Sequence, residues 1–285
     1  MSDLPVRLAH PLTLLLAPVL AVQGLRVRRG TPRLPEAAGA RAGTASAPGT
    51  ARGAAQGTEA LPGTAQGTAR GTARGAAQGT ETVSGAGAGE PLRVAVLGES
   101  TAAGVGVTTH EEGLAGCLAR ALAVRAARPV SWQVAARSGI NTRATTAELV
   151  PLLESADAVV AVLGVNELLE LNWPSRFGRQ LRELVGTVRG RIPGVPIVVT
   201  GMPPVSRFPA LPQPLRAVMG LRARALDRVM RETAADVAGV TYAAVDVPAE
   251  PAGFFARDGF HPSARGYEVW AGGLAEVLSD VLTHR

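Results

Sequence analysis

One serine in the chain follows an apolar run and precedes small residues, at a position where a side chain can reach a ligand. Val94–Leu97 is a short apolar run that ends at Gly98, and Ser100 lies two residues further on. A run of this length bounded by glycine predicts a buried strand, and helical periodicity resumes near Leu114. Ser100 is therefore expected at the carboxyl end of a strand, where open α/β sheets bind ligands. A serine there is either an exposed nucleophile or a residue that caps the turn.

A second group that can do chemistry lies near the end of the chain. Asp258 precedes His261 by three residues, in the stretch RDGFHPS that begins at Arg257. In a tight loop, this spacing can place a carboxylate on one imidazole nitrogen and leave the other nitrogen free, which is how a base is oriented toward a serine. The alternative is that Asp258 caps a turn and that His261 is a buried residue with its hydrogen bonds satisfied.

Hydrogen-bond donors follow two other predicted strands. Gly139 lies in the stretch 136–142 after the second strand, and Asn166 lies in 164–167 after the third. A glycine offers an unobstructed backbone N–H, and an asparagine amide can donate to a developing oxyanion. A plain turn at Gly139 and a helix cap at Asn166 are the alternatives. Together with the serine and the histidine pair, these loops supply a nucleophile, an oriented base and two oxyanion donors.

The elements that must position these residues alternate along the chain. Strands are predicted at 92–97, 130–135, 158–163, 196–200 and 240–245, and helices at about 111–126, 143–154, 175–190, 214–237 and 263–283. Such alternation forms βαβ units, which build a parallel sheet with helices on both faces. The sequence therefore predicts an α/β fold with a parallel sheet of about five strands, in one domain over residues 91–285.

Residues 1–35 are predicted to form an N-terminal apolar segment. Residues 11–25 are apolar, but Pro18 interrupts them and they are fewer than the roughly 20 of a membrane-spanning helix. Arginines follow at once, at positions 26, 28, 29 and 33, which favours retention of the carboxyl side in the cytoplasm. We expect residues 11–29 to bind the inner face of a membrane and the protein to be cytoplasmic. The signal peptide of a secreted protein and an extra helix docked on the domain are the alternatives.

Residues 36–90 are of low complexity and consist mostly of Gly, Ala, Thr, Arg and Gln. The stretch GTARGAAQGTE occurs at 49–59 and again at 71–81. Stacked repeats need large apolar residues to bury against their neighbours, and this stretch lacks them. We predict a disordered linker that takes no part in the chemistry.

The composition excludes several other classes of site. All 29 basic residues are arginine, and they are interspersed with the 23 acidic residues, so a nucleic-acid partner is not expected. A Walker-type phosphate loop needs a lysine and is excluded. The single cysteine, Cys117, has the spacing of a small core residue, and there is no Cys/His cluster for zinc. The sequence therefore predicts neither a metal nor a cofactor.

Four blocks of this sequence resemble those of the SGNH (GDSL-type) hydrolase family, over about residues 92–283. Gly98-Glu99-Ser100 is similar to the first block, and Gly139 to the glycine of the second. Gly164-Val165-Asn166-Glu167 is similar to the third block, and Asp258-Gly259-Phe260-His261-Pro262 to the last. Four blocks in this order over this length are far more specific than any one block.

The resemblance implies a flavodoxin-like three-layer α/β/α sandwich and hydrolysis of esters or thioesters without a metal. It implies that Ser100 is the nucleophile and that Asp258 and His261 complete the catalytic triad. It also implies an oxyanion hole made by the N–H groups of Ser100 and Gly139 with the side chain of Asn166.

Three positions depart from the usual pattern of the family. Glu99 stands before the serine and Glu167 after the asparagine, where Asp is usual in both places. Both changes keep a carboxylate but lengthen it, so the catalytic groups are intact and the local turns are expected to differ. Thr101 stands where the GDSL pattern has its leucine, which places the chain in a divergent branch.

We therefore expect a serine hydrolase that cleaves carboxylic esters through an acyl-enzyme, as an esterase, a lipase or a lysophospholipase-like enzyme. Three largely apolar stretches are expected to flank the pocket, at 168–173, 202–205 and 208–215. They favour a small-molecule or lipid-like ester, although ordinary packing over the sheet edge explains them equally well. A carbohydrate O-deacetylase or a thioesterase on the same site is one alternative. A non-catalytic binding or scaffold protein that kept the fold is the alternative of another class.

Overall fold

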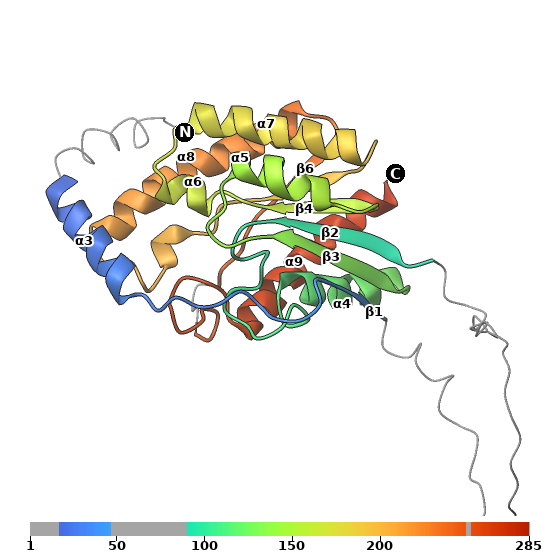
Figure 1. Ribbon diagram of the computed structural model, residues 1–285, viewed down its shortest axis with the longest axis horizontal. Helices are drawn as coiled ribbons and strands as arrows, with labels where there is room; N and C mark the ends of the chain where they lie inside the picture. Colours follow the sequence, from blue (N-terminus) through green and yellow to red (C-terminus); the bar gives the residue numbers. More distant parts are fainter. Residues whose placement is uncertain (1–16, 47–89, 249–251, 285) are drawn as a thin grey trace, which may run out of the picture.

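Six strands form one sheet in the computed structural model, which describes residues 17–46, 90–248 and 252–284 (Figure 1). The order across the sheet is β1-β3-β2-β4-β5-β6. Strands β2 to β6 run parallel to their neighbours, whereas β1 pairs antiparallel with β3. The predicted α/β fold with a parallel sheet is confirmed, but the described strands number six and not about five. Their bounds are β1 (Ala42–Ala45), β2 (Leu92–Gly98), β3 (Val130–Ala136), β4 (Ala158–Val162), β5 (Ile197–Thr200) and β6 (Val240–Ala243).

The additional strand, β1, corrects the prediction of a linker over residues 36–90, because it pairs with β3 over its whole length. Gly43 of β1 packs against the indole of Trp132, so closely that a Cβ atom would lie 2.6 Å from the ring. Composition did not predict this strand because pairing with the free edge of β3 satisfies backbone groups and needs no large apolar side chain. Residues 47–89 lie outside the described residues, so the rest of the linker and the domain boundaries at 35 and 90 stay predictions.

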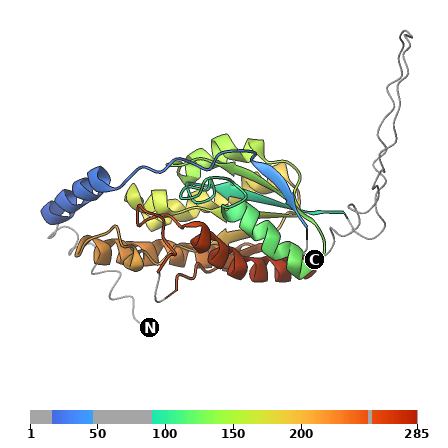
Figure 2. The same ribbon diagram turned by 90° about the horizontal axis from the view of Figure 1, so that it is seen from below.

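Helices cover both faces of the sheet and give the three layers that the sequence predicted (Figure 1, Figure 2). On one face lie α4 (Leu114–Ala126) and α9 (Ala264–Thr283), which pack against each other. On the other face lie α7 (Pro174–Arg191) and α8 (Leu215–Asp236).

The helix expected over 143–154 is irregular. It consists of α5 (Thr142–Ala144), a π turn (Thr145–Leu149) and a 3₁₀ turn (Val150–Leu152). Pro151 lies in the last of these turns and cannot donate a backbone hydrogen bond, so a regular helix could not continue through it.

Side chains of the strands alternate between two cores, one on each face of the sheet. Ala95 and Leu97 of β2 belong to the core beneath α7 and α8, whereas Val94 and Val96 belong to the core beneath α4 and α9. All residues of β4 are buried. Strands that are buried on both faces are continuous apolar runs, which is why they could be recognised in the sequence.

The carboxyl ends of the central strands lie level with one another. Gly98 at the end of β2 pairs with Ala136 on one side and with Val162 on the other. A Cβ atom on Gly98 would lie 2.0 Å from the carbonyl oxygen of Val162, so only glycine allows β2 and β4 to approach this closely. The loops after β2, β3 and β4 therefore leave the sheet at one edge, as the parallel arrangement predicts.

Helix α3 (Ala17–Gly30) precedes the sheet and lies against the start of α8 (Figure 1). The side chain of Gln23 donates to the carbonyl of Gln213 at 2.6 Å and accepts the N–H of Leu215 at 3.1 Å. Within the described part of the chain, no helix has the length and apolar character needed to cross a membrane. Residues 11–16 lie outside that part, so binding of residues 11–29 to a membrane surface stays a prediction.

Candidate active site

Ser100 lies on the turn that follows β2, within hydrogen-bond distance of the imidazole of His261. Its Oγ atom is 2.9 Å from His261 Nε2. The hydroxyl of Tyr267, a fully buried residue of α9, donates to the carbonyls of Val105 and Thr101 at 2.7 and 3.2 Å. A helix beneath the sheet thereby holds the turn that presents the serine.

Asp258 holds the ring of His261 from the other side. Its Oδ2 atom is 2.6 Å from His261 Nδ1, and its Oδ1 atom accepts the backbone N–H groups of Phe260 and His261. Burial of this carboxyl opposes its ionisation, but the bonds from His261 and from the two N–H groups outweigh burial and hold the pKa of Asp258 below its ordinary value. An ionised Asp258 accepts a hydrogen bond from the Nδ1–H group and so fixes the tautomer of the neutral imidazole.

The three side chains form one continuous chain of hydrogen bonds. With the proton on Nδ1, the free Nε2 atom of His261 can accept the hydroxyl proton of Ser100. A serine beside such a base can attack an electrophile as its proton moves to the imidazole. Capping of the turn by Ser100 does not account for its contact with a residue 161 positions away. The structure therefore brings together the three residues that the sequence predicted as a triad.

The two loops predicted to donate to an oxyanion lie beside each other at the same edge of the sheet. Asn166 lies in the first turn of α6 (Val165–Leu169), and its Nδ2 atom donates to the carbonyl of Ile140 at 2.8 Å. This bond uses one of two amide hydrogens and ties Asn166 to the loop of Gly139. Gly139 itself is exposed, with a φ of 77°. Asn166 is not a helix cap, since Gly164 occupies that position in α6.

Buried Glu99 fixes the backbone on either side of Asn166, a role that the sequence did not predict. Its two oxygens accept the N–H groups of Val165 and Asn166 at 2.8 and 2.9 Å. Burial raises the pKa of Glu99 to about 7, although the hydrogen bonds from these N–H groups lower it. The longer side chain that departs from the family pattern thus spans the gap between the ends of β2 and β4.

Glu167 makes a similar link on the other side of Asn166. It is 1% exposed, and its Oε1 atom accepts the N–H of Thr142 at 2.7 Å. This bond joins α6 to the start of α5, directly after the loop of Gly139. Both unusual glutamates therefore connect loops of the site through backbone N–H groups.

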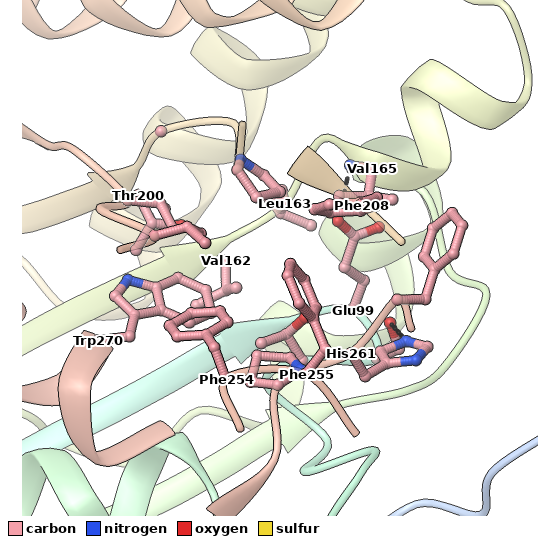
Figure 3. Close-up of a pocket in the computed structure, with 18 residues that line it drawn as sticks. Glu99, Val162, Leu163, Val165, Thr200, Phe208, Phe254, Phe255, His261 and Trp270 are labelled. Atoms are coloured by element: carbon pink, nitrogen blue, oxygen red, sulfur yellow. Dashed lines mark hydrogen bonds between the residues drawn. The ribbon is translucent and has the colours of Figure 1, made fainter. Parts of the chain in front are cut away.

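A narrow cavity opens beside Ser100 and His261 (Figure 3). Its free volume is about 40 Å³. Its aromatic walls are formed by Phe208, Phe254, Phe255, Phe260 and Trp270. The rings of Phe208 and Phe255 meet edge to face with centroids 5.4 Å apart, and those of Phe208 and Phe260 with centroids 5.0 Å apart.

The stretches that were expected to flank the pocket do so only in part. Pro203 and Phe208 line the cavity, from the second and third of these stretches. The first stretch, 168–173, does not line it, and its residues Leu169, Leu171 and Trp173 are more than half exposed. Phe254 and Phe255 were missed because they lie in an irregular segment between β6 and α9, where no periodicity marks a buried side chain.

The described residues contain no cluster of three or more His, Cys, Asp or Glu side chains that could hold a metal ion. Cys117 is buried in α4, and its thiol donates to the carbonyl of Glu112 at 3.4 Å. It therefore lies in the core and not at the site.

Comparison with known proteins finds a family and a relative to which this chain is similar. The sequence profile of the GDSL-like lipase/acylhydrolase family matches residues 96–269. The GDSL-like esterase Rv1075c of Mycobacterium tuberculosis is 28% identical over 202 residues, which are 68% of this chain and 64% of that protein. The chain thus spans less than two thirds of the length of this relative.

Solved structures show the same fold at lower identity. The crystal structure of TesA superimposes with a TM-score of 0.53 at 22% identity, over 66% of this chain and 99% of that one. A carbohydrate esterase family 2 enzyme of Corynascus thermopiles (Myceliophthora fergusii), solved with a carbohydrate-binding domain, gives a TM-score of 0.54 at 15% identity. The superposition covers 70% of this chain and 69% of that enzyme's chain.

Proposed function

Because the chain belongs to the GDSL-like lipase/acylhydrolase family, we propose that it hydrolyses carboxylic esters with Ser100 as its nucleophile. The observation that carries the proposal is the chain of hydrogen bonds from Ser100 through His261 to Asp258, with lengths of 2.9 and 2.6 Å. An alcohol needs an adjacent base to act as a nucleophile near neutral pH, and that base needs a fixed tautomer. Both requirements are met by side chains of this chain.

In the proposed acylation step, Ser100 Oγ attacks the carbonyl carbon of the ester while its proton moves to His261 Nε2. The carbonyl oxygen becomes an oxyanion, which receives hydrogen bonds from the N–H groups of Ser100 and Gly139 and from the free amide hydrogen of Asn166. His261 then gives its proton to the leaving alcohol as the C–O bond breaks. Asp258 stabilises the imidazolium that exists between these two transfers.

Deacylation repeats this sequence with water in place of the serine. A water molecule loses a proton to His261 Nε2 and attacks the carbonyl carbon of the acyl-enzyme. The second oxyanion forms in the same hole, and the proton returns to Ser100 as the carboxylic acid leaves. Both halves therefore depend on the same donors, and loss of one donor is expected to lower kcat by about a hundredfold or more.

The acyl group is proposed to occupy the aromatic cavity beside Ser100. Four phenylalanines and Trp270 favour an apolar group, and a free volume of about 40 Å³ limits its size. Short-chain esters are thus favoured over the long-chain esters of a lipase or a lysophospholipase.

The size of the cavity also favours a second candidate, the removal of acetyl groups from a hydroxylated substrate such as a carbohydrate. An acetyl group is small enough to favour a cavity of this size, and the alcohol side of the ester would lie outside the cavity. A thioester would enter by the same route, since the attacking and oxyanion-binding groups would be unchanged.

Hydrolysis of p-nitrophenyl esters from acetate to dodecanoate, by the wild type and by Ser100→Ala, tests the proposal. We expect Ser100→Ala to lose at least about a thousandfold in kcat, and the wild type to prefer acetate or butyrate. Ser155→Ala, at the opposite end of the sheet, is the matched control and should keep wild-type rates. Equal rates for Ser100→Ala and Ser155→Ala would refute the assignment of the nucleophile.

Labelling with a fluorophosphonate separates an enzyme from a scaffold that kept the fold. An activated serine forms a covalent bond to phosphorus and releases fluoride, so the wild type should be labelled once per chain and Ser100→Ala should not be labelled. Failure of the wild type to react would support the non-catalytic alternative.

A further inference from the structure

Residues 31–46, here called the N-terminal segment, run from α3 to β1 along the edge of the sheet that carries Ser100 (Figure 1, Figure 2). The N–H of Ala37 donates to the carbonyl of Ala103 at 3.0 Å, and the N–H of Ala38 donates to that of Thr108 at 2.9 Å. Ala37 is buried against Gly104. The segment therefore packs on the turn that presents Ser100, although its residues 36–46 were predicted to be part of a disordered linker without a role.

Two side chains of the N-terminal segment hold the loop that carries Gly139. Glu36 Oε1 accepts the backbone N–H of Ser138 at 2.6 Å, and Glu36 Oε2 accepts Nη2 of Arg41 at 2.6 Å. The other end of the same guanidinium, Nη1, donates to the carbonyl of Ala136 at 2.6 Å. Glu36 and Arg41 thus fix both the last residue of β3 and the residue directly before Gly139.

The loop has other supports as well, since Arg137 Nη1 donates to Glu148 Oε2 at 2.6 Å and Asn166 donates to the carbonyl of Ile140. Arg137, Ser138 and Gly139 are all exposed, and the N–H of Arg137 donates to the carbonyl of Gly98. Glu36 holds the N–H of Ser138, in the peptide directly before the one that carries the Gly139 N–H, so only the φ and ψ angles of Ser138 separate the two groups. An exposed backbone that must present an N–H in one direction gains from a charged acceptor, whose hydrogen bonds are about twice as strong as neutral ones.

From these contacts we propose that Glu36 is a positioning residue, which holds Ser138 so that the Gly139 N–H points at the oxyanion. The inference rests on the proposed ester hydrolysis, because only that reaction gives the N–H a task. Arg41 serves the same end by orienting the carboxylate of Glu36 and by binding the carbonyl of Ala136. The N-terminal segment accordingly helps to position the loop of Gly139, and does not only connect α3 to β1.

A contribution to catalysis can be separated from one to stability. The Glu36 and Arg41 side chains are 28% and 44% exposed, and exposed ion pairs contribute little to stability. Glu36→Ala should therefore unfold at nearly the same temperature as the wild type. Its kcat should fall about tenfold, less than for outright loss of an oxyanion donor, with KM changed less than about twofold.

Kinetics of four full-length variants and of one control variant test the inference. Glu36→Gln keeps an oxygen for Ser138 N–H and should recover to within about threefold of the wild type, whereas Glu36→Ala should not. The kcat of Arg41→Met should fall less than that of Glu36→Ala. The double variant Glu36→Ala/Arg41→Met should have the same kcat as Glu36→Ala, because both residues act through one loop. Glu276→Ala removes the exposed ion pair with Arg125 and is the matched control, with wild-type kinetics expected.

Fluorophosphonate labelling supplies the second readout. The phosphoryl oxygen occupies the oxyanion hole, so the labelling rate of Glu36→Ala should fall with kcat while the final stoichiometry stays at one per chain. Wild-type kcat in Glu36→Ala would overturn the inference, and so would a loss accounted for by a smaller labelled fraction. If instead Ser100→Ala remained active or the wild type were not labelled, it would be the proposed function that failed.

Discussion

Glu99 shows how a single buried side chain can make the stability of the fold depend on pH. Its carboxyl is 3% exposed and accepts the N–H groups of Val165 and Asn166. Burial raises its pKa to about 7, whereas the ordinary value is 4.5. Between these pH values the folded protein holds a proton on Glu99 that the unfolded chain releases. The contribution of Glu99 to stability is therefore full below pH 4.5 and is lost as the pH rises toward 7.

This difference predicts a pH-dependent gap in stability between the wild type and Glu99→Gln. Relative to the variant, the free energy of unfolding of the wild type should fall by up to about 3 kcal/mol between pH 4.5 and 7. Urea unfolding of both proteins across this range measures it. Buried His110, whose pKa is lowered by burial, titrates in both proteins and cancels from the difference. A gap that does not change with pH would show that Glu99 does not titrate in this range.

At the residue scale, the sequence indicated the candidate catalytic side chains but not the residues that hold them in place. Asp258 and His261 are three positions apart and Ser100 follows a recognisable strand, but this spacing left capping roles open, and it was the resemblance to the SGNH family that implied a triad. Glu99 acts on a residue 66 positions away and Glu36 on one 102 positions away. In the local sequence, nothing distinguishes either glutamate from other acidic residues, because its role depends on a backbone N–H that only the fold brings close. Local patterns carry no information about such contacts.

Among the elements, β1 decides whether Glu36 and Arg41 can reach the active-site loop. Arg41 directly precedes the strand, and its carbonyl accepts the N–H of Val134 at 2.7 Å. Gly43 lies flat on the buried ring of Trp132, which cannot move aside. The position of the N-terminal segment therefore depends on the absence of a side chain at Gly43.

Substitution of Gly43 by valine should displace β1 and thereby slow catalysis. The first atom of the new side chain would lie 2.6 Å from the Trp132 ring, so the strand must move away from β3. We expect kcat to fall by up to about tenfold, with Glu36→Ala adding little to the loss, because both changes release one loop. Steady-state kinetics on p-nitrophenyl acetate measure the effect.

Gly186→Val is the matched control, since Gly186 is exposed in α7 and a Cβ atom there would meet nothing within 4 Å. It should retain wild-type kinetics. Wild-type kcat in Gly43→Val would mean that the ordered strand has no influence on the site.

Elements with long periodic or fully buried patterns were predicted closely, and those held by backbone contacts alone were not. The strand expected at 92–97 is observed at Leu92–Gly98, and the helix expected at 175–190 at Pro174–Arg191. By contrast, β1 has only small residues, and α6 spans one short turn after a strand. Both elements are stabilised by contacts with residues far away in the sequence, and local sequence patterns do not reveal such contacts.

At the scale of the whole molecule, the cavity exists because distant parts of the chain meet at one edge of the sheet. Its walls come from the ends of β4 and β5, from the loop at Phe208, from the segment at Phe254 and from Trp270 of α9. Residues from both faces of the sheet thus enclose the space beside Ser100. The size of the cavity is set by how these parts pack together, and no single stretch of sequence encodes it.

Phe255→Ala should enlarge this cavity and shift the preference toward longer acyl chains. Phe255 is only partly buried, so its removal opens the space next to Phe208 at a smaller cost in stability than the loss of a fully buried ring. One methylene in an apolar pocket changes selectivity by roughly tenfold or more, so kcat/KM for hexanoate relative to acetate should rise at least about tenfold. Leu169→Ala, at an exposed apolar residue outside the cavity, should keep the wild-type ratio. If Leu169→Ala changed the ratio and Phe255→Ala did not, the acyl chain would lie over residues 168–173, and the aromatic cavity would not be its binding site.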